Sequence, residues 1–202
     1  MGRDPPRRGA RLHRLTPMAL SAPALMARLE GYAIGPDDAD FTFAARLARE
    51  NGWDLPTAER AIVEYKRFCY LAMTAGHAVT PSDAVDQVWH LHLTFTRDYW
   101  QRFCPEVLGR PLHHGPTRGG PAERMRFYDQ YAATLKSYEA AFGELPPSDL
   151  WPAARQRFVD DPKAFRVNPS DVLILSRRRV KMVAVVALVL VTTVATVLWG
   201  KF

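Results

Sequence analysis

Apolar residues recur at helical spacing through almost the whole middle of the chain, and this periodicity constrains the fold more than any other feature. Spacings of three and four residues are typical of amphipathic α-helices. The clearest helix begins at Asp54-Leu-Pro-Thr and directs a single apolar stripe inward: Ala61, Ile62, Tyr65, Phe68, Cys69 and Ala72. Strand signals are weak, and Val172 to Leu175 is the one short candidate. The pattern predicts an all-α body of about five or six helices.

Helix boundaries can be placed where capping residues meet this pattern. Gly76 is expected to end the helix that begins at Asp54. Thr80 reads as the N-cap of the next helix, because Pro81 then falls at the first helical position. A short helix follows Thr94 or Thr96, and a long one runs from Pro121 to about Phe142.

A stretch of 18 residues without a charge, Met182 to Trp199, lies close to the C-terminus. As a helix it would measure roughly 27 Å, close to the thickness of a bilayer core. Basic residues precede it, which predicts that the N-terminal body stays in the cytoplasm. The sequence therefore predicts a single-pass protein of the cell membrane, with the lipid bilayer as a partner. A buried core helix is the alternative.

These features divide the chain into four parts. We expect a basic flexible tail at 1–20, a helical body at 21–165, a basic linker at 166–181 and the transmembrane helix at 182–199. The body contains a histidine-rich segment at 86–120.

The net charge of +6 is concentrated at the two ends of the chain. Residues 1–20 contain five Arg and one Asp, whereas residues 21–176 contain more acidic than basic side chains. An acidic body argues against a nucleic-acid-binding domain. A protein at the membrane is a further partner that we expect. The two cysteines, Cys69 and Cys104, cannot form a disulfide framework and suit a reducing compartment.

Four of the six histidines lie between residues 90 and 114. Asp86 and His90 are four residues apart, about 40° around a helix, so both can face one point. His92 lies about 200° from His90 and cannot join it while the helix continues. Imidazole, carboxylate and thiolate groups bind transition metals. The predicted ligands of a divalent transition metal such as zinc are His90, His114, Asp86, Cys104 and His113.

The alternative is a set of core histidines bonded to Asp86 and to backbone carbonyls, with no metal. Under both interpretations we expect His90→Ala to be more harmful than His92→Ala, because only His90 shares the face of Asp86.

A glycine-rich loop, residues 115–120, precedes the helix that begins at Pro121. Backbone N–H groups at a helix N-terminus can bind an anion. The predicted anion-binding groups are Arg110, Arg118, Gly119 and Gly120. The alternative is a turn that needs glycine for a positive φ.

Three runs of sequence resemble one known family. They are VDQVWHLHL at 85–93, TRDYWQRFC at 96–104 and LGRPLHHGPTRGG at 108–120. They are similar to the glycine-rich domain-containing protein-like family, a domain of unknown function, in its bacterial membrane-attached branch. The matching positions are Asp86, Trp89, His90, His92, Tyr99, Cys104, Gly109, Arg110 and His114. The resemblance implies one structural unit and no reaction, and this chain lacks the glycine-rich tract that names the plant members.

The resulting functional hypothesis is a tail-anchored cytoplasmic helical module that binds or scaffolds a partner and holds a metal. One alternative is a metal-dependent hydrolase for an anionic substrate, in which His92 or Asp98 would act as the base and Arg110 and Arg118 would receive the substrate. The other alternative is a structural metal site without turnover.

Overall fold

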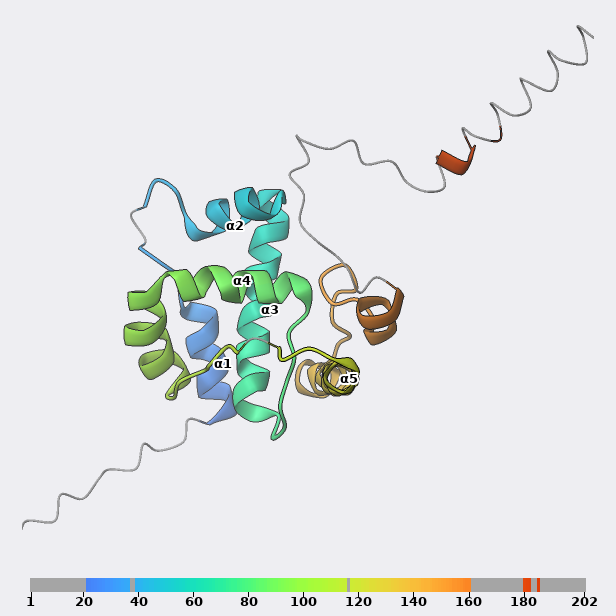
Figure 1. The fold of residues 1–202 in the computed structure, drawn as a ribbon. Coiled ribbons are helices and arrows are strands. Elements are labelled where there is room, and N and C mark those ends of the chain that lie inside the picture. Colours follow the sequence, from blue (N-terminus) through green and yellow to red (C-terminus); the bar gives the residue numbers. More distant parts are fainter. Residues whose placement is uncertain (1–20, 37–38, 116, 161–179, 183–184, 186–202) are drawn as a thin grey trace, which may run out of the picture. The chain divides into compact units, whose positions relative to one another are not determined.

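A computed structural model describes residues 21–36, 39–115, 117–160, 180–182 and 185 (Figure 1). The helices discussed below all belong to the unit formed by residues 1–163.

The described residues form helices and contain no strand, which confirms the all-α prediction for this part of the chain. The elements are α1 (Ala22–Gly31), α2 (Phe43–Asn51), α3 (Leu55–Thr74), α4 (Asp83–Thr94), the π-helix η1 (Asp98–Leu108), α5 (Pro121–Phe142) and the π-helix η2 (Gln156–Asp160).

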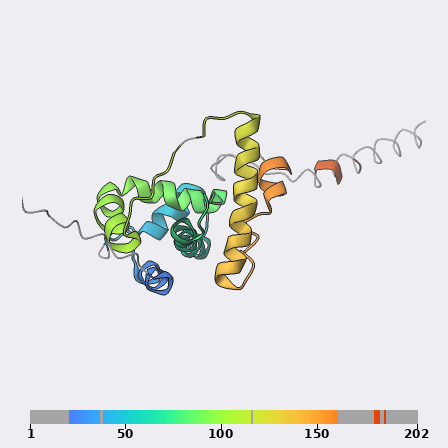
Figure 2. The same ribbon diagram turned by 90° about the horizontal axis from the view of Figure 1, so that it is seen from below.

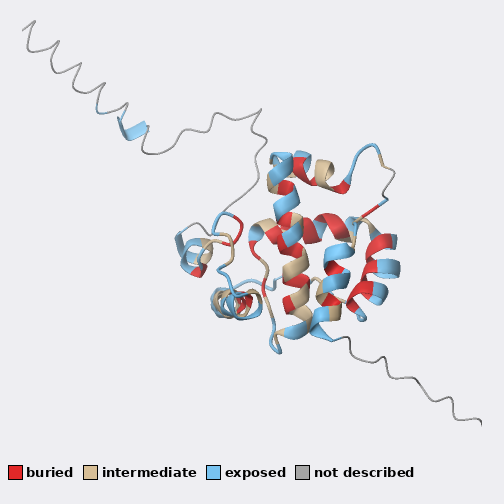
Figure 3. Ribbon diagram, turned by 180° about the vertical axis from the view of Figure 1, so that it is seen from behind, coloured by how far each residue is buried: buried red, intermediate tan, exposed pale blue. Residues whose placement is uncertain are grey.

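Helix α3 is the centre of the body and contacts α1, α2, α4 and α5 (Figures 1 and 2). Its start agrees with the prediction, because Asp54 Oδ1 accepts a hydrogen bond from Thr57 N at 2.9 Å. The side chains of Tyr65 and Phe68 are almost fully buried. Buried residues lie along one side of several helices while the other side is exposed, as the helical periodicity requires (Figure 3).

Helix α4 begins two residues later than predicted. Ser82 is its N-cap, with Oγ accepting from Val85 N at 3.2 Å. Thr80 instead donates its backbone N–H to Thr134 Oγ1 of α5 at 3.0 Å. Thr80 and Ser82 have the same capping chemistry, so a long-range contact with α5, which local sequence does not show, decides between them.

The segment after α4 is a π-helix, whereas the sequence predicted an ordinary short helix. Pro105 lies inside η1, and a proline has no N–H for the helical ladder. Helical periodicity does not distinguish a π-helix from an α-helix over three turns. The element still buries Tyr99, Phe103 and Cys104 in the core.

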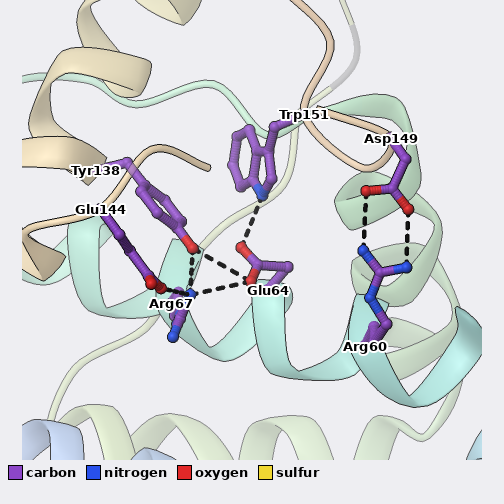
Figure 4. A network of polar contacts seen from close by, with 7 residues as sticks. All are labelled: Arg60, Glu64, Arg67, Tyr138, Glu144, Asp149 and Trp151. Atoms are coloured by element: carbon purple, nitrogen blue, oxygen red, sulfur yellow. Dashed lines mark hydrogen bonds and ion pairs between the residues drawn. The ribbon is translucent and has the colours of Figure 1, made fainter. Parts of the chain in front are cut away.

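A polar network joins α3 to α5 and to the loop that follows α5 (Figure 4). The buried carboxylate of Glu64 accepts from Trp151 Nε1 at 2.9 Å and from Tyr138 OH at 3.2 Å. Arg67 lies beside it and bridges Glu64 to Glu144. Since each group has a partner, this network fastens α5 to the body without a buried unpaired charge.

The transmembrane part of the predicted fold is corrected by the structure. Within the described ranges, no helix combines the length and the apolar character needed to cross a bilayer. The two long helices, α3 with 20 residues and α5 with 22, carry charged side chains along their length. This finding overturns the transmembrane helix, the single-pass topology and the cell-membrane localisation that we predicted from residues 182–199.

Only Met182 and Val185 of that predicted span are among the described residues, and both are exposed. The predicted tail at 1–20, most of the predicted linker at 166–181, and the strand candidate at 172–175 lie outside the described residues.

Candidate metal site

Helix α4 places Asp86 and His90 on one face, as their spacing requires. His90 Nε2 lies 3.7 Å from Asp86 Oδ2. The side chain of His90 is 48% exposed and that of Asp86 is 22% exposed. This face of α4 is therefore open to solvent.

The loop after η1 brings His114 to the same face. His114 Nε2 lies 2.9 Å from Asp86 Oδ1 and 3.1 Å from His90 Nε2. The three residues each offer one ligand atom, and these atoms all lie within 4.8 Å of one another. Residues 28 positions apart in the sequence thus form a compact set of two imidazoles and one carboxylate.

Two aromatic residues hold this loop in place, and neither was predicted from the sequence to have this role. Tyr99 OH donates to the carbonyl of Leu112 and accepts from Trp89 Nε1 at 2.9 Å. The Trp89 ring meets the His114 ring edge-on, with centroids 4.6 Å apart. Burial raises the pKa of Tyr99, so its hydroxyl keeps the proton that it donates. Both residues are among the positions that carry the sequence resemblance, and that resemblance was the available signal.

Two of the predicted ligands do not join the set. His113 is exposed and packs its ring against Trp100, with centroids 5.4 Å apart. Cys104 is buried in the core, and burial raises the pKa of its thiol. A metal requires the thiolate, which this apolar environment disfavours. The structure therefore assembles Asp86, His90 and His114 and leaves Cys104 and His113 apart.

His92 lies on the opposite side of α4, fully inside the core. Its Nδ1 is 3.0 Å from Tyr65 OH, and its Nε2 is 3.0 Å from Asp98 Oδ2. Burial lowers the pKa of His92 to about 4, against the opposing effect of the Asp98 carboxylate. Asp98 also pairs with Arg102 at 2.8 Å. Neither His92 nor Asp98 is placed to act as a base at the His90 face.

Asp98 also lines a separate pocket of about 480 Å³. The other lining residues are Gly35, Pro36, Phe95, Thr96, Arg97, Gln101 and Arg102. None of the three clustered ligand residues belongs to this pocket.

Of the predicted anion-binding side chains, that of Arg110 is engaged within the protein. Arg110 Nη2 donates to the carbonyls of Ala72 and Met73, and so caps the end of α3. The hydroxyl of Thr117 donates to Glu123 Oε2 at 2.7 Å. That bond is the main cause that lowers the pKa of Glu123.

The turn before α5 also directs backbone groups of the predicted site toward this carboxylate. Hydrogen bonds from the backbone of Gly119 and Arg118 help to lower the pKa of Glu123. Gly119 and Gly120 have φ angles of +77° and +93°, the angles that the alternative interpretation, a glycine turn, requires. A carboxylate of the protein thus already lies where an external anion would bind.

Comparison with known proteins gives one match. Residues 43–137 match the model of the UCP032817-like family, a domain of unknown function. The matched range contains all three clustered residues. No curated protein and no solved structure matches the chain. The match supports an uncharacterised family for this segment and shows neither a glycine-rich domain nor a bacterial membrane-attached branch.

Proposed function

We propose that this protein binds a divalent transition-metal ion, with zinc the first candidate, through Asp86, His90 and His114. The observation that carries the proposal is the convergence of two imidazole Nε2 atoms, 3.1 Å apart, on the Asp86 carboxylate, whose Oδ1 lies 2.9 Å from His114 Nε2 and whose Oδ2 lies 3.7 Å from His90 Nε2. Ligand atoms about 2.0–2.1 Å from a tetrahedral zinc ion lie about 3.3–3.4 Å from one another. The separation of the two Nε2 atoms is close to this value, and one ligand atom from each residue lies within 4.8 Å of the other two.

The hydrogen-bonding requirements of the three side chains also favour a bound metal ion. His114 Nε2 faces both a carboxylate oxygen, which only accepts, and the Nε2 of His90. If His114 Nε2 carries a proton, that one proton has to serve both neighbours; if it does not, its lone pair faces the carboxylate. A cation between the three atoms removes this conflict, because all three then present lone pairs to it.

The backbone reduces the cost of bringing the ligands together. Asp86 and His90 are one turn apart on a helix whose N-cap is satisfied by Ser82. The carbonyl of Leu112, two residues before His114, is held by Tyr99. Ligands fixed in this way lose little conformational freedom when an ion binds.

The broader role that we propose is a metal-dependent binding module of this uncharacterised family. The resemblance to the glycine-rich domain-containing protein-like family supports treating residues 86–120 as one unit. A protein partner and the exclusion of nucleic acid stay predictions from the charge distribution. The hydrolase alternative would need a base other than His92 or Asp98, because both point into the core.

The test is zinc binding by the full-length chain after removal of metal with a chelator. We expect one zinc ion per chain by equilibrium dialysis against a competing chelator. Loss of one of three ligands in His90→Ala or His114→Ala should weaken binding by more than about 100-fold. His113→Ala is the matched control, because His113 is adjacent in sequence but outside the cluster, and it should bind as the wild type does. Absence of stoichiometric zinc, or equal binding by all variants, would contradict the proposal.

A further inference from the structure

The proposed metal site has three protein ligands among the described residues. No fourth His, Cys, Asp or Glu in the described part of the chain joins the cluster. Structural zinc sites are closed by four protein ligands, whereas sites that take an external ligand keep one position open. With Asp86, His90 and His114 as its ligands, an ion would retain at least one position for a group from outside.

The two sides of the cluster differ in accessibility. On the core side, the buried Trp89 ring lies against His114 and is fixed by Tyr99. On the other side, nearly half of the His90 side chain is exposed to solvent. The open coordination position therefore faces solvent, where a small molecule can reach it without rearrangement of the core.

The charge of the site indicates which kind of molecule binds. Two neutral imidazoles and one carboxylate leave a divalent ion with a net charge of about +1. Asp86 and His114 are each only 22% exposed, so this charge is partly shielded from water. A small anion with a hard oxygen or nitrogen donor would complete the coordination and neutralise the charge.

We propose that this site takes a small anionic ligand, a carboxylate or a related oxyanion, directly on the metal at its solvent-facing position. Binding is a ligand exchange: the anion forms one bond to the metal and a bound water leaves to the solvent. No electron or proton transfer is required. The inference rests on the proposed metal binding and assigns to that site a class of ligand.

The test uses Co²⁺ in place of zinc in the full-length protein, because the visible bands of Co²⁺ report coordination. Stoichiometric Co²⁺ should bind to the wild type and to His113→Ala, and should be lost from His114→Ala. Addition of acetate should shift the bands and saturate with one anion per Co²⁺. Potassium chloride at equal ionic strength controls for a general salt effect.

The outcomes separate the two proposals. If Co²⁺ binds stoichiometrically but acetate does not change its bands, the site takes no carboxylate and this inference is wrong, while metal binding stands. If Co²⁺ does not bind, or binds equally to His114→Ala, the proposed function fails and the anion site fails with it. If Co²⁺ binds and acetate shifts its bands to saturation at one acetate per Co²⁺, the inference is supported.

Discussion

His90 and His92 lie two residues apart on one helix, yet their surroundings are opposite. His92 is fully buried, and each ring nitrogen has one partner: Tyr65 OH at Nδ1 and the Asp98 carboxylate at Nε2. His90 is half exposed, and its Nε2 faces the Nε2 of His114.

The two sites differ in whether each ring nitrogen of the histidines has a matching hydrogen-bond donor or acceptor. Around His92, Nε2–H donates to Asp98 and Nδ1 accepts from Tyr65, so every group is satisfied without a ligand. Around His114, a single Nε2–H has to be shared between the Asp86 carboxylate and His90 Nε2. Around His92 every donor has an acceptor, and such contacts stabilise the fold. At the solvent-exposed cluster one proton is shared between two acceptors, and replacing that proton by a metal ion gives each atom a partner.

The largest expected effect is on stability when His92 is removed. His92→Ala leaves Asp98 and Tyr65 with unsatisfied groups and opens a cavity, so we expect a loss of about 3 kcal/mol or more in the free energy of unfolding. His90→Ala in the presence of a chelator should change it by no more than about 0.5 kcal/mol. Urea unfolding of both variants measures the difference. Equal losses would show that the two faces of α4 do not differ as described.

This ranking reverses the one expected from the sequence. The helical spacing places His90 with Asp86 and places His92 on another face, and the structure agrees. The spacing does not reveal what that other face meets. Tyr65 comes from α3, 27 residues away, and only the packing of α3 against α4 makes His92 the buried member of the pair.

The second prediction concerns pH and tests the same contrast in solution. The folded pKa of His92 is lowered to about 4, below about 6.5 in the unfolded chain. As the pH falls from 6.5 to 4, the unfolded state gains a proton that the folded state does not. Stability should therefore fall over this window, by about 3 kcal/mol at most from this group. The other polar groups that face His92 are Asp98, which is paired with Arg102, and Tyr65, whose pKa is raised by burial.

Histidine ring resonances followed by NMR in the presence of a chelator give the measurement. Of the six histidines, one resonance should remain in the neutral form to about pH 4, and it should persist in His90→Ala. If no histidine resonance stays in the neutral form down to about pH 4, then His92 is not enclosed.

A structural feature could be predicted from the sequence where neighbouring residues determine it, and could not where contacts between distant residues do. The start of α3 at Asp54 and the extent of α5 from Pro121 to Phe142 follow from capping and periodicity, and both are confirmed. The π-helix η1 and the N-cap at Ser82 were missed, because Pro105 and a long-range contact of Thr80 decide them. The same local reasoning failed for the membrane span, since lack of charge in a stretch does not by itself establish a spanning helix.

For the candidate site, helical phase allowed Asp86 and His90 to be paired from the sequence, but not the choice between His113 and His114. Neighbouring loop residues point in different directions, and the choice depends on how Tyr99 holds the carbonyl of Leu112. Cys104 has a suitable ligand atom, yet burial of Cys104 removes it from the set.

A third prediction extends the comparison of buried and exposed polar groups to α3, where the buried Glu64 carboxylate is hydrogen-bonded to Trp151 and Tyr138. Glu64→Ala leaves the Trp151 Nε1–H and one bond of Tyr138 without the carboxylate. We expect a loss of about 2 kcal/mol in the free energy of unfolding, measured in urea. A loss below about 0.5 kcal/mol would mean that water replaces the carboxylate and that the network is not closed.

The smallest effect is expected one turn away on the same helix. Arg60 makes two contacts of 2.8 Å with Asp149, which is better pair geometry than any contact of Glu64. Both side chains are more than half exposed, however, so water and salt compete with the pair. Arg60→Ala should therefore unfold at the same urea concentration as the wild type within error, and any difference should vanish in 0.5 M sodium chloride, roughly, where screening is nearly complete. A destabilisation as large as that of Glu64→Ala would show that bond geometry, and not enclosure, determines what a polar contact contributes in this protein.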